Sequence, residues 1–267
     1  MLTADKLKEV RSQIRSGCFQ KNTSGLMPNL VQGNLVIMPQ QWADEFIRFC
    51  RLNPKPCPLI GISKPGNPSI PELGHGLDIR IDVPEYHLFR DGIYTSAAPD
   101  IKAYWQDDSV AIVLGCSFSF ESALQSAGLA VKNINQGTNV SMYDTNIATQ
   151  ATANFDCNMV VSMRPFKKHN IDQVISITNK FPKAHGAPVH IGDPQLIGIS
   201  DICSPEYGSP VVLDDDDIPV FWACGVTTQA AIRSAKLPLV ITHAPGKMLI
   251  TDHLYEDLGE LSDNFVG

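Results

Sequence analysis

Two segments of the chain share one plan, in which a buried strand passes through a cysteine and glycine corner into a helix. The apolar run at residues 110–114 leads into Gly-Cys-Ser-Phe-Ser at 115–119, and a helical stretch at 120–127 ends at Gly128. The apolar residues 220–223 lead into Cys-Gly at 224–225, and a helix follows from Thr227 to Lys236. A continuous apolar run is typical of a strand covered on both faces. This plan favours an α/β chain over an all-helical or an all-β one.

The remaining segments alternate between helical and extended patterns. Helices are expected from Thr3 to Gly17, from Pro39 to the proline-rich segment 53–58, and after Asn170. Strands are expected at residues 34–38, 59–63, 78–83, 159–162, 189–191, 196–199 and 239–241, with a long loop at 64–76 and a solvated acidic turn at 214–217. The predicted fold class is α/β, with a mixed sheet and flanking helices plus a second, smaller α+β domain.

The two corners also suggest where the chain divides. A chain of 267 residues is long enough for one large domain or two modest ones. The corners lie on either side of the stretch with the most mixed composition. We therefore place residues 1–108 and 202–267 in a discontinuous α/β domain, and residues 109–201 in an inserted α+β domain.

Composition excludes several classes of partner. The formal net charge is −7 without any cluster of Lys or Arg, so the chain is a poor candidate for binding nucleic acid or an anionic membrane. No apolar run approaches the roughly 20 residues of a spanning helix, and residues 1–17 lack the apolar segment of a signal peptide. The seven cysteines include no C-x-x-C pair, which argues against a disulfide framework or a zinc ribbon. We expect a soluble, cytoplasmic protein, and leave open whether it is a homo-oligomer.

Both corners are candidates for binding a small carboxylic acid. A helix N-terminus offers free N–H groups to an anion and lowers the pKa of a thiol. In open α/β sheets, ligands bind where strands end. The alternative is that the hydroxyl residues only cap helices and the cysteines only pack. The candidate substrate-binding residues are Cys116, Ser117, Ser119, Cys224 and Thr227 of the corners together with His185, and Thr228 is a further candidate for the pocket.

A second group of candidates carries acid–base chemistry. His185, His190 and Asp193 fall within nine residues among Gly and Pro, and His243 follows a buried strand. Imidazole and carboxylate are the usual general acids and bases, although such residues are also common as solvated or capping groups. Two His and one Asp can also bind a divalent metal, but their spacing fits no regular helix or strand. No cofactor is therefore predicted, and a divalent metal stays open.

Arg164 and Glu121 complete the set of candidates. Arg164 ends a strand, where its guanidinium can hold a substrate carboxylate or pair with an acidic residue of the fold. Glu121 lies in the first turn of a helix, where it either acts as an acid or complements the helix dipole. The chain carries none of the common nucleotide-binding, esterase or metalloprotease motifs.

Several long segments together resemble the D-glutamate cyclase family, whose bacterial members are described as hydro-lyases. The resemblance covers nearly the whole chain. It implies a two-part α/β fold and, for the cyclase members, conversion of D-glutamate to 5-oxo-D-proline with loss of water. The segments, in order, are Asn-Leu-Val-Ile at 34–37, Asn-Pro-Lys-Pro-Cys-Pro at 53–58, Gly-Cys-Ser-Phe-Ser-Phe-Glu at 115–121, Val-Val-Ser-Met-Arg-Pro at 160–165, His-Gly-Ala-Pro-Val-His-Ile-Gly-Asp-Pro at 185–194, Pro-Val-Phe-Trp-Ala-Cys-Gly-Val-Thr at 219–227 and Thr-His-Ala-Pro-Gly at 242–246.

The chain departs from the family pattern at three positions. Ser141 stands where Pro is common, Asp144 where Arg is common, and Lys247 where His is common. If the usual Arg holds a substrate carboxylate, Asp144 would repel it, because both groups are negative. The identity of the substrate is therefore open.

These observations predict an enzyme, a hydro-lyase that acts on a small amino or hydroxy acid, with D-glutamate as one candidate. Arg164 and the N–H groups at 116–119 would hold carboxylate oxygens and stabilise an oxyanion. His190 or His243 would act as the base, and Asp193 or Glu121 as the acid or as the group that orients the His. Three alternatives remain: a protein that binds a small carboxylic acid without turnover, a metal-dependent dehydratase using His185, His190 and Asp193, and a thioester route through Cys116 or Cys224.

Overall fold

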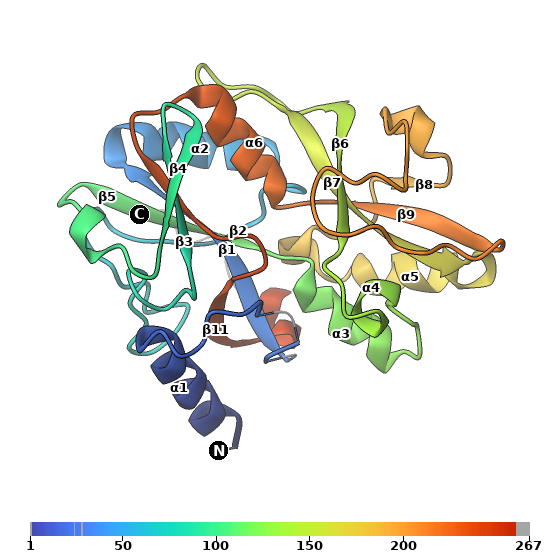
Figure 1. Ribbon diagram of the computed structural model, residues 1–267, viewed down its shortest axis with the longest axis horizontal. Coiled ribbons are helices and arrows are strands. Elements are labelled where there is room, and N and C mark those ends of the chain that lie inside the picture. Colours follow the sequence, from blue (N-terminus) through green and yellow to red (C-terminus); the bar gives the residue numbers. More distant parts are fainter. Residues whose placement is uncertain (1, 24, 28, 260–267) are drawn as a thin grey trace.

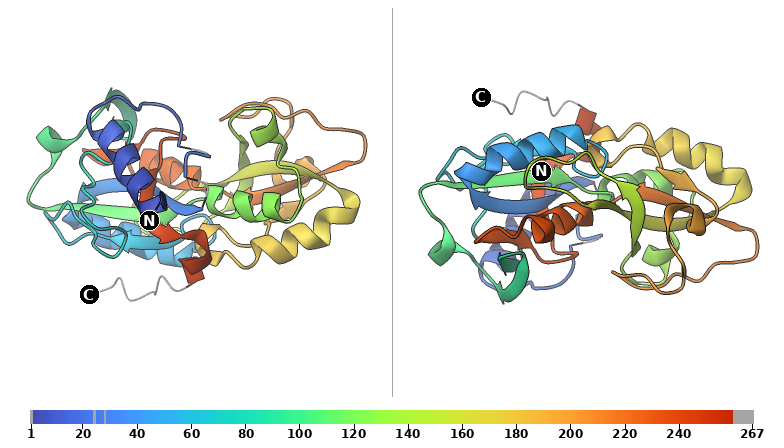
Figure 2. Two further views of the ribbon diagram at one scale, coloured as in Figure 1. Left: turned by 90° about the horizontal axis from the view of Figure 1, so that it is seen from below. Right: turned by 90° about the horizontal axis from the view of Figure 1, so that it is seen from above.

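The chain folds into two lobes that lie side by side, each built on one β-sheet (Figures 1 and 2). The computed structural model describes residues 2–23, 25–27 and 29–259. The larger sheet has the strand order β2-β5-β1-β10-β3-β4, and β11 also pairs with β1. Its strands are β1 (Leu30–Pro39), β2 (Leu59–Ile62), β3 (Tyr86–Arg90), β4 (Ile93–Ala98), β5 (Ser109–Gly115), β10 (Val240–His243) and β11 (Leu249–Leu254).

The smaller sheet has the strand order β6-β7-β9-β8. Its strands are β6 (Ser141–Ala148), β7 (Asn158–Lys167), β8 (His190–Ile191) and β9 (Asp217–Ala223). The structure confirms the predicted α/β class, since helices and strands mix along the chain. In the described part of both sheets, every two neighbouring strands that pair are antiparallel. The parallel pairs expected of a mixed sheet are therefore not found there.

Six α-helices in the described part of the chain cover these sheets. They are α1 (Leu2–Arg15), α2 (Gln40–Leu52), α3 (Phe118–Ser126), α4 (Lys132–Asn135), α5 (Ile171–Thr178) and α6 (Val226–Ala235), and short 3-10 helices occupy Lys102–Tyr104, Lys168–Asn170, Pro182–Ala184, Pro194–Ile197 and Tyr255–Gly259. The apolar stripe of α2, with Phe46 and Phe49, packs with α6 on one face of the larger sheet. None of the helices in these described ranges has the length and apolarity needed to cross a bilayer.

The other face of the larger sheet belongs to a core that continues into the smaller lobe. Leu35 and Val113 of the larger sheet share this core with Phe120 of α3 and Trp222 of β9. Apolar surface buried where the two lobes meet stabilises their contact by about 25 cal/mol per Å². The two lobes are therefore packed together as well as joined by the chain.

The chain changes lobe at the two cysteine corners. Strand β5 belongs to the larger sheet and α3 to the smaller lobe, so the first crossing lies at Gly115–Cys116. Strand β9 belongs to the smaller sheet and α6 covers the larger one, so the second lies at Cys224–Gly225. These crossings differ from the predicted boundaries at 108/109 and 201/202, although the division into domains itself stays a prediction. Below, residues 116–224 are called the smaller lobe and the rest of the described chain the larger lobe.

Two predicted strands are wrong, because short polar side chains close turns there. Residues 78–83 form turns, in which Asp82 accepts the backbone N–H of Asp78 and Asp78 accepts that of Arg80. Such side chain to backbone bonds compete with a strand ladder. Residues 196–199 were expected as a strand, but Pro194–Ile197 is a 3-10 helix whose first N–H group, that of Gln195, donates to the Asp193 carboxylate.

The acidic turn at 214–217 is only partly solvated. Asp217 is buried at the start of β9 and pairs with Lys132 and Lys167. Four strands were not predicted at all: β3, β4, β6 and β11. Strand β4 is exposed along almost its whole length, so it carries no apolar alternation by which the sequence could have revealed it.

Candidate functional site

The two cysteine corners meet around Asn34 of β1. The side-chain amide of Asn34 donates a hydrogen bond of 2.9 Å to the carbonyl oxygen of Gly115. A Cβ at Gly225 would overlap that same amide, and a Cβ at Gly115 would overlap the backbone carbonyl of Lys183. Position 115 therefore requires glycine, because a backbone carbonyl cannot give way, whereas a side chain at Gly225 would have to displace the Asn34 amide and its bond to Gly115.

A buried ion pair of the smaller lobe lies just beyond the first corner. Arg164 of β7 is 0% exposed and Glu121 of α3 is 3% exposed. The Nε and Nη2 groups of Arg164 donate to Oε1 of Glu121, at 2.8 and 2.5 Å. Ser162 and Ser117 each accept a further hydrogen bond from Arg164 at 3.0 Å.

Aromatic rings hold the guanidinium in this position. Its carbon lies 5.2 Å from the centre of the Phe120 ring and 5.7 Å from that of Trp222. Such cation–π contacts, together with hydrogen bonds, offset the cost of removing a charge from water. Arg164 is thus locked in place, and Glu121 with it.

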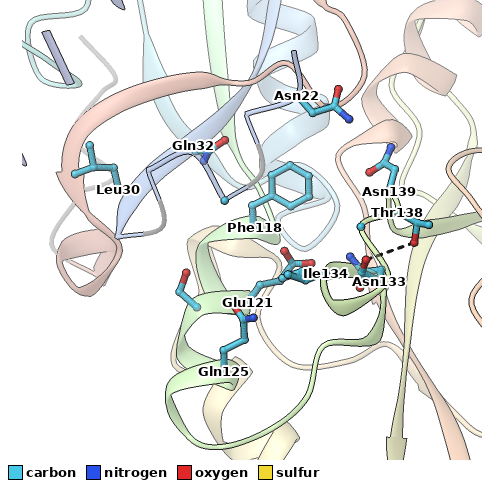
Figure 3. A pocket seen from close by; sticks show the side chains of 14 residues that line it. Asn22, Leu30, Gln32, Phe118, Glu121, Gln125, Asn133, Ile134, Thr138 and Asn139 are labelled. Atoms are coloured by element: carbon cyan, nitrogen blue, oxygen red, sulfur yellow. Dashed lines mark hydrogen bonds between the residues drawn. The ribbon is translucent and has the colours of Figure 1, made fainter. Parts of the chain in front are cut away.

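A polar pocket of about 270 Å³ opens above Glu121 (Figure 3). Helices α3 and α4 form one wall, and the chain around Asn22, Gln32 and Gly246 of the larger lobe forms the other. Glu121 supplies the one charged side chain among the described lining residues. They are Asn22, Gly25, Leu30, Gln32, Phe118, Glu121, Ser122, Gln125, Asn133, Ile134, Gly137, Thr138, Asn139 and Gly246.

Two amides of this pocket carry buried oxygen atoms that lack a hydrogen-bond partner among the described residues. They are Oε1 of Gln32 and Oδ1 of Asn133. Gln32 uses its Nε2 to donate to the carbonyl oxygen of Thr23 at 3.0 Å, which leaves only its oxygen for another group. A buried polar group without a partner costs roughly 1–3 kcal/mol. These oxygens therefore point to a ligand that brings N–H or O–H donors.

Four other predicted site residues lie beside the Glu121–Arg164 ion pair. Ser117 accepts a hydrogen bond from Arg164, and Cys116, Cys224 and His185 lie close enough to Arg164 for its charge to act on them. Burial raises the pKa of Cys116 to about 12 and raises that of Cys224 as well. Both thiols therefore stay protonated at neutral pH, against the expectation from a helix N-terminus.

The threonine hydroxyl groups of the second corner form hydrogen bonds to backbone groups of the fold. Thr227 accepts from the N–H of Val160 at 3.0 Å, which fixes α6 to β7, and Thr228 donates to Gly225. The Oγ of Ser119 is buried and has no hydrogen-bond partner among the described residues. The structure thus supports a capping or packing role for the two threonines.

The structure does not bring His190 and Asp193 to the pocket. The ring of His190 packs on Phe221 of β9, whereas Arg164 packs on the next residue, Trp222. Because neighbouring residues of a strand point to opposite faces, His190 lies across the smaller sheet from Arg164. Its Nε2 bonds the backbone oxygen of Asp193 at 2.7 Å, and the Asp193 carboxylate caps a 3-10 helix.

The other two histidines are buried with backbone partners. Nδ1 of His185 bonds the carbonyl oxygen of Lys55 at 2.7 Å, and Nδ1 of His243 accepts the N–H of Leu35 at 3.0 Å. Burial lowers the pKa of each to about 4, so both are neutral. No group of three or more His, Cys, Asp or Glu side chains in the described part of the chain is arranged to hold a metal ion.

Sequence reasoning missed the amides that line the pocket. Gln32 lies inside a strand and Asn133 in a helix of a single turn, and neither belongs to a motif with a recognised chemistry. Asn and Gln are common on any surface, so their residue types alone give no signal. Only the packing of the two lobes brings them together.

Comparison with known proteins connects the chain to one family. The D-glutamate cyclase family model matches residues 110–252. A relative from Aliivibrio salmonicida, named "Putative hydro-lyase", is 54% identical over 96% of this chain and 98% of its own. A relative of the same name from Bradyrhizobium sp. ORS 278 is 57% identical over 90% of this chain and 88% of its own.

Among solved structures, a nitrogen repressor-like protein from Methanococcus jannaschii aligns over 92% of this chain and 98% of its own, with a TM-score of 0.38 and 9% identity. The family match spans more than half of the chain and both cysteine corners, and the relatives extend it to nearly the full length. The resemblance seen in the sequence motifs is confirmed: the chain belongs to the D-glutamate cyclase family.

Proposed function

We propose that the chain is an enzyme, a hydro-lyase that removes water from a small amino or hydroxy acid bound in the pocket above Glu121. The family and the names of the relatives support this class of reaction. The observation that carries the proposal is the burial of Glu121 together with its pairing and its position in the pocket wall. Its carboxylate is almost fully buried, is held by Arg164 through Oε1 alone, and lines the pocket.

For D-glutamate, loss of water means closing a ring to 5-oxo-D-proline. The amine must first lose a proton, because an ammonium group has no free electron pair. The nitrogen then attacks the side-chain carboxyl carbon, and one carboxyl oxygen leaves as water. Two protons move from nitrogen to that oxygen, so charge and atoms balance. Oε2 of Glu121 would carry these protons, a role worth about 10²–10⁴ in rate.

An elimination of water would use the same group. Glu121 would take the proton from the carbon next to the carboxylate, and return it to the departing hydroxyl. Both reactions require a base that sits in the pocket and is shielded from bulk water. Glu121 meets this requirement, since it is 3% exposed and lines the cavity.

The structure suggests a different role for Arg164 from the one expected. It is fully buried and bonded to Glu121, Ser117 and Ser162. We therefore assign it to positioning Glu121 rather than to holding a substrate carboxylate. The N–H groups of Ser119 and Phe120 bond the carbonyls of Cys116 and Ser117, so they do not support an anion site there.

The experiment is an incubation of the protein with a panel of amino and hydroxy acids, followed by mass spectrometry for loss of water. On the substrate found, Glu121→Gln should lower kcat by about 10² or more, because the amide cannot carry a proton. Glu9→Gln, a matched change at an exposed glutamate of α1, should leave kcat unchanged.

Two results would reject the proposal. If Glu121→Gln is as active as the wild type, the pocket is not the reaction site. If acids of the panel bind but none loses water, the chain is a binding protein without turnover.

A further inference from the structure

The pocket holds a negative charge and no positive one among its described lining residues. Apart from Glu121 the polar lining consists of neutral amides and hydroxyls, including Gln32, Gln125 and Asn133. Arg164 lies behind the wall, and its charge is already paired with Glu121. A ligand in this pocket thus meets no free guanidinium or ammonium group of the lining.

The acceptors of the pocket match an ammonium group. Gln32 can offer only its oxygen, because its Nε2 is bonded to Thr23. Glu121 offers a carboxylate oxygen that Arg164 does not occupy. Oδ1 of Asn133 is a further buried acceptor without a hydrogen-bond partner among the described residues.

A second carboxylate finds no cation to pair with among the described lining residues, only neutral amides and hydroxyls. Closing a lactam consumes one ammonium group and one carboxylate group, and the amide that forms in the ring carries no charge. D-glutamate carries one carboxylate more, which survives the reaction and must be accommodated throughout. Burying an unpaired carboxylate is costly, and a neighbouring carboxylate such as Glu121 adds repulsion.

We infer that the pocket selects small amino acids with one ammonium and a single carboxylate over dicarboxylic ones such as D-glutamate. This rests on the proposed function, because it takes the pocket above Glu121 as the substrate site. The inference thus narrows the substrate class of this member relative to the name of its family.

The test compares two ligands of nearly the same shape by titration calorimetry. D-glutamine differs from D-glutamate in that an amide replaces the side-chain carboxylate. The wild type should bind D-glutamine at least about tenfold more tightly, a difference of roughly 1.4 kcal/mol. Affinity is the readout, so the result does not depend on turnover.

A charge placed in the pocket should change this preference. Gln125 is an exposed lining residue one turn along α3 from Glu121. Gln125→Lys should reduce the preference for D-glutamine by about tenfold, because the new ammonium offsets the negative charge of the pocket. Gln195→Lys makes the same change at an exposed residue of the 3-10 helix Pro194–Ile197 and should leave it unaltered.

Equal or tighter binding of D-glutamate by the wild type would overturn the inference, as would the absence of binding by both ligands. An equal effect of Gln125→Lys and Gln195→Lys would also contradict it, because the charge would then act without regard to the pocket. The Glu121→Gln assay separates these failures from that of the proposed function. If turnover depends on Glu121 while D-glutamate is preferred, only the selectivity is wrong.

Discussion

Arg164 holds Glu121 by one oxygen only, since its Nε and Nη2 both donate to Oε1. A fork-like pair would engage both carboxylate oxygens. Here the second oxygen is left to the pocket that Glu121 lines. Glu121 thereby belongs both to the buried ion pair of the smaller lobe and to the cavity at the junction of the two lobes.

Removal of the cation should destabilise the protein strongly. Arg164→Met leaves the Glu121 carboxylate buried without its partner, which should lower the free energy of unfolding by about 3–5 kcal/mol. Urea denaturation measures this. The double variant Arg164→Met with Glu121→Gln should recover part of the loss, because no unpaired charge remains. A single variant as stable as the wild type would contradict the structural role of the pair.

The first corner should not tolerate a side chain. Gly115→Ala would force its new methyl into the backbone carbonyl of Lys183, which cannot move away as a flexible side chain can. We expect a loss of several kcal/mol, or failure to fold, as for overpacked cores. Gly74→Ala is the control, because its methyl would meet only the ends of the Asp252 and Arg11 side chains. Thermal unfolding of both variants checks this, and equal melting temperatures would refute it.

Stability should fall as the pH drops from about 6.5 to about 4. The folded pKa of His185 and of His243 is about 4, below the unfolded value of about 6.5, so the unfolded chain binds more protons in this window. Titration of each histidine should lower the free energy of unfolding by about 2 kcal/mol between pH 7.5 and pH 5.

A variant at one of these histidines isolates its share. His185→Asn keeps a donor for the carbonyl of Lys55 and should lose that much less stability over the same range, measured by urea unfolding at both pH values. His75→Gln, at an exposed site, should show the wild-type slope. An unchanged slope in His185→Asn would show that His185 titrates normally.

The corner thiols should be dispensable for turnover. Cys116→Ser and Cys224→Ser should keep kcat within about tenfold, because a thiol that stays protonated is a poor nucleophile. The measurement is the assay on the substrate found in the panel. Loss of all activity in either variant, with the fold intact by circular dichroism, would instead favour the thioester route.

The loop between β6 and β7 should contribute to holding the lobes together. It reaches from the smaller sheet toward α2, where Phe155 packs against Phe46 and Phe49 (Figure 1). Phe155→Ala should cost about 3–5 kcal/mol of stability, because it leaves a cavity in this core. Leu196→Ala, at a residue that is 71% exposed, should cost little. The midpoint of urea unfolding reports both.

The sequence by itself determined the elements that carry strong local signals. The apolar run of β5, the stripe of α2 and the glycine and cysteine corners appear where their patterns predicted them, because alternation and periodicity report burial directly. The motifs also sufficed for the family. Among the site candidates, Glu121 and Arg164 were proposed from residue type and position, but the sequence offered Arg164 only an unspecified acidic partner in the fold.

Tertiary structure alone decided which candidates meet. His190 and Arg164 lie on opposite faces of one sheet, a consequence of strand register that spacing along the chain does not reveal. The pocket exists because Gln32 of the larger lobe faces α3 and α4 of the smaller one, and these segments are distant in sequence. Contacts of this kind depend on how two cores pack across the junction. The local pattern of residues determines which side chains are buried, but not which of them become neighbours.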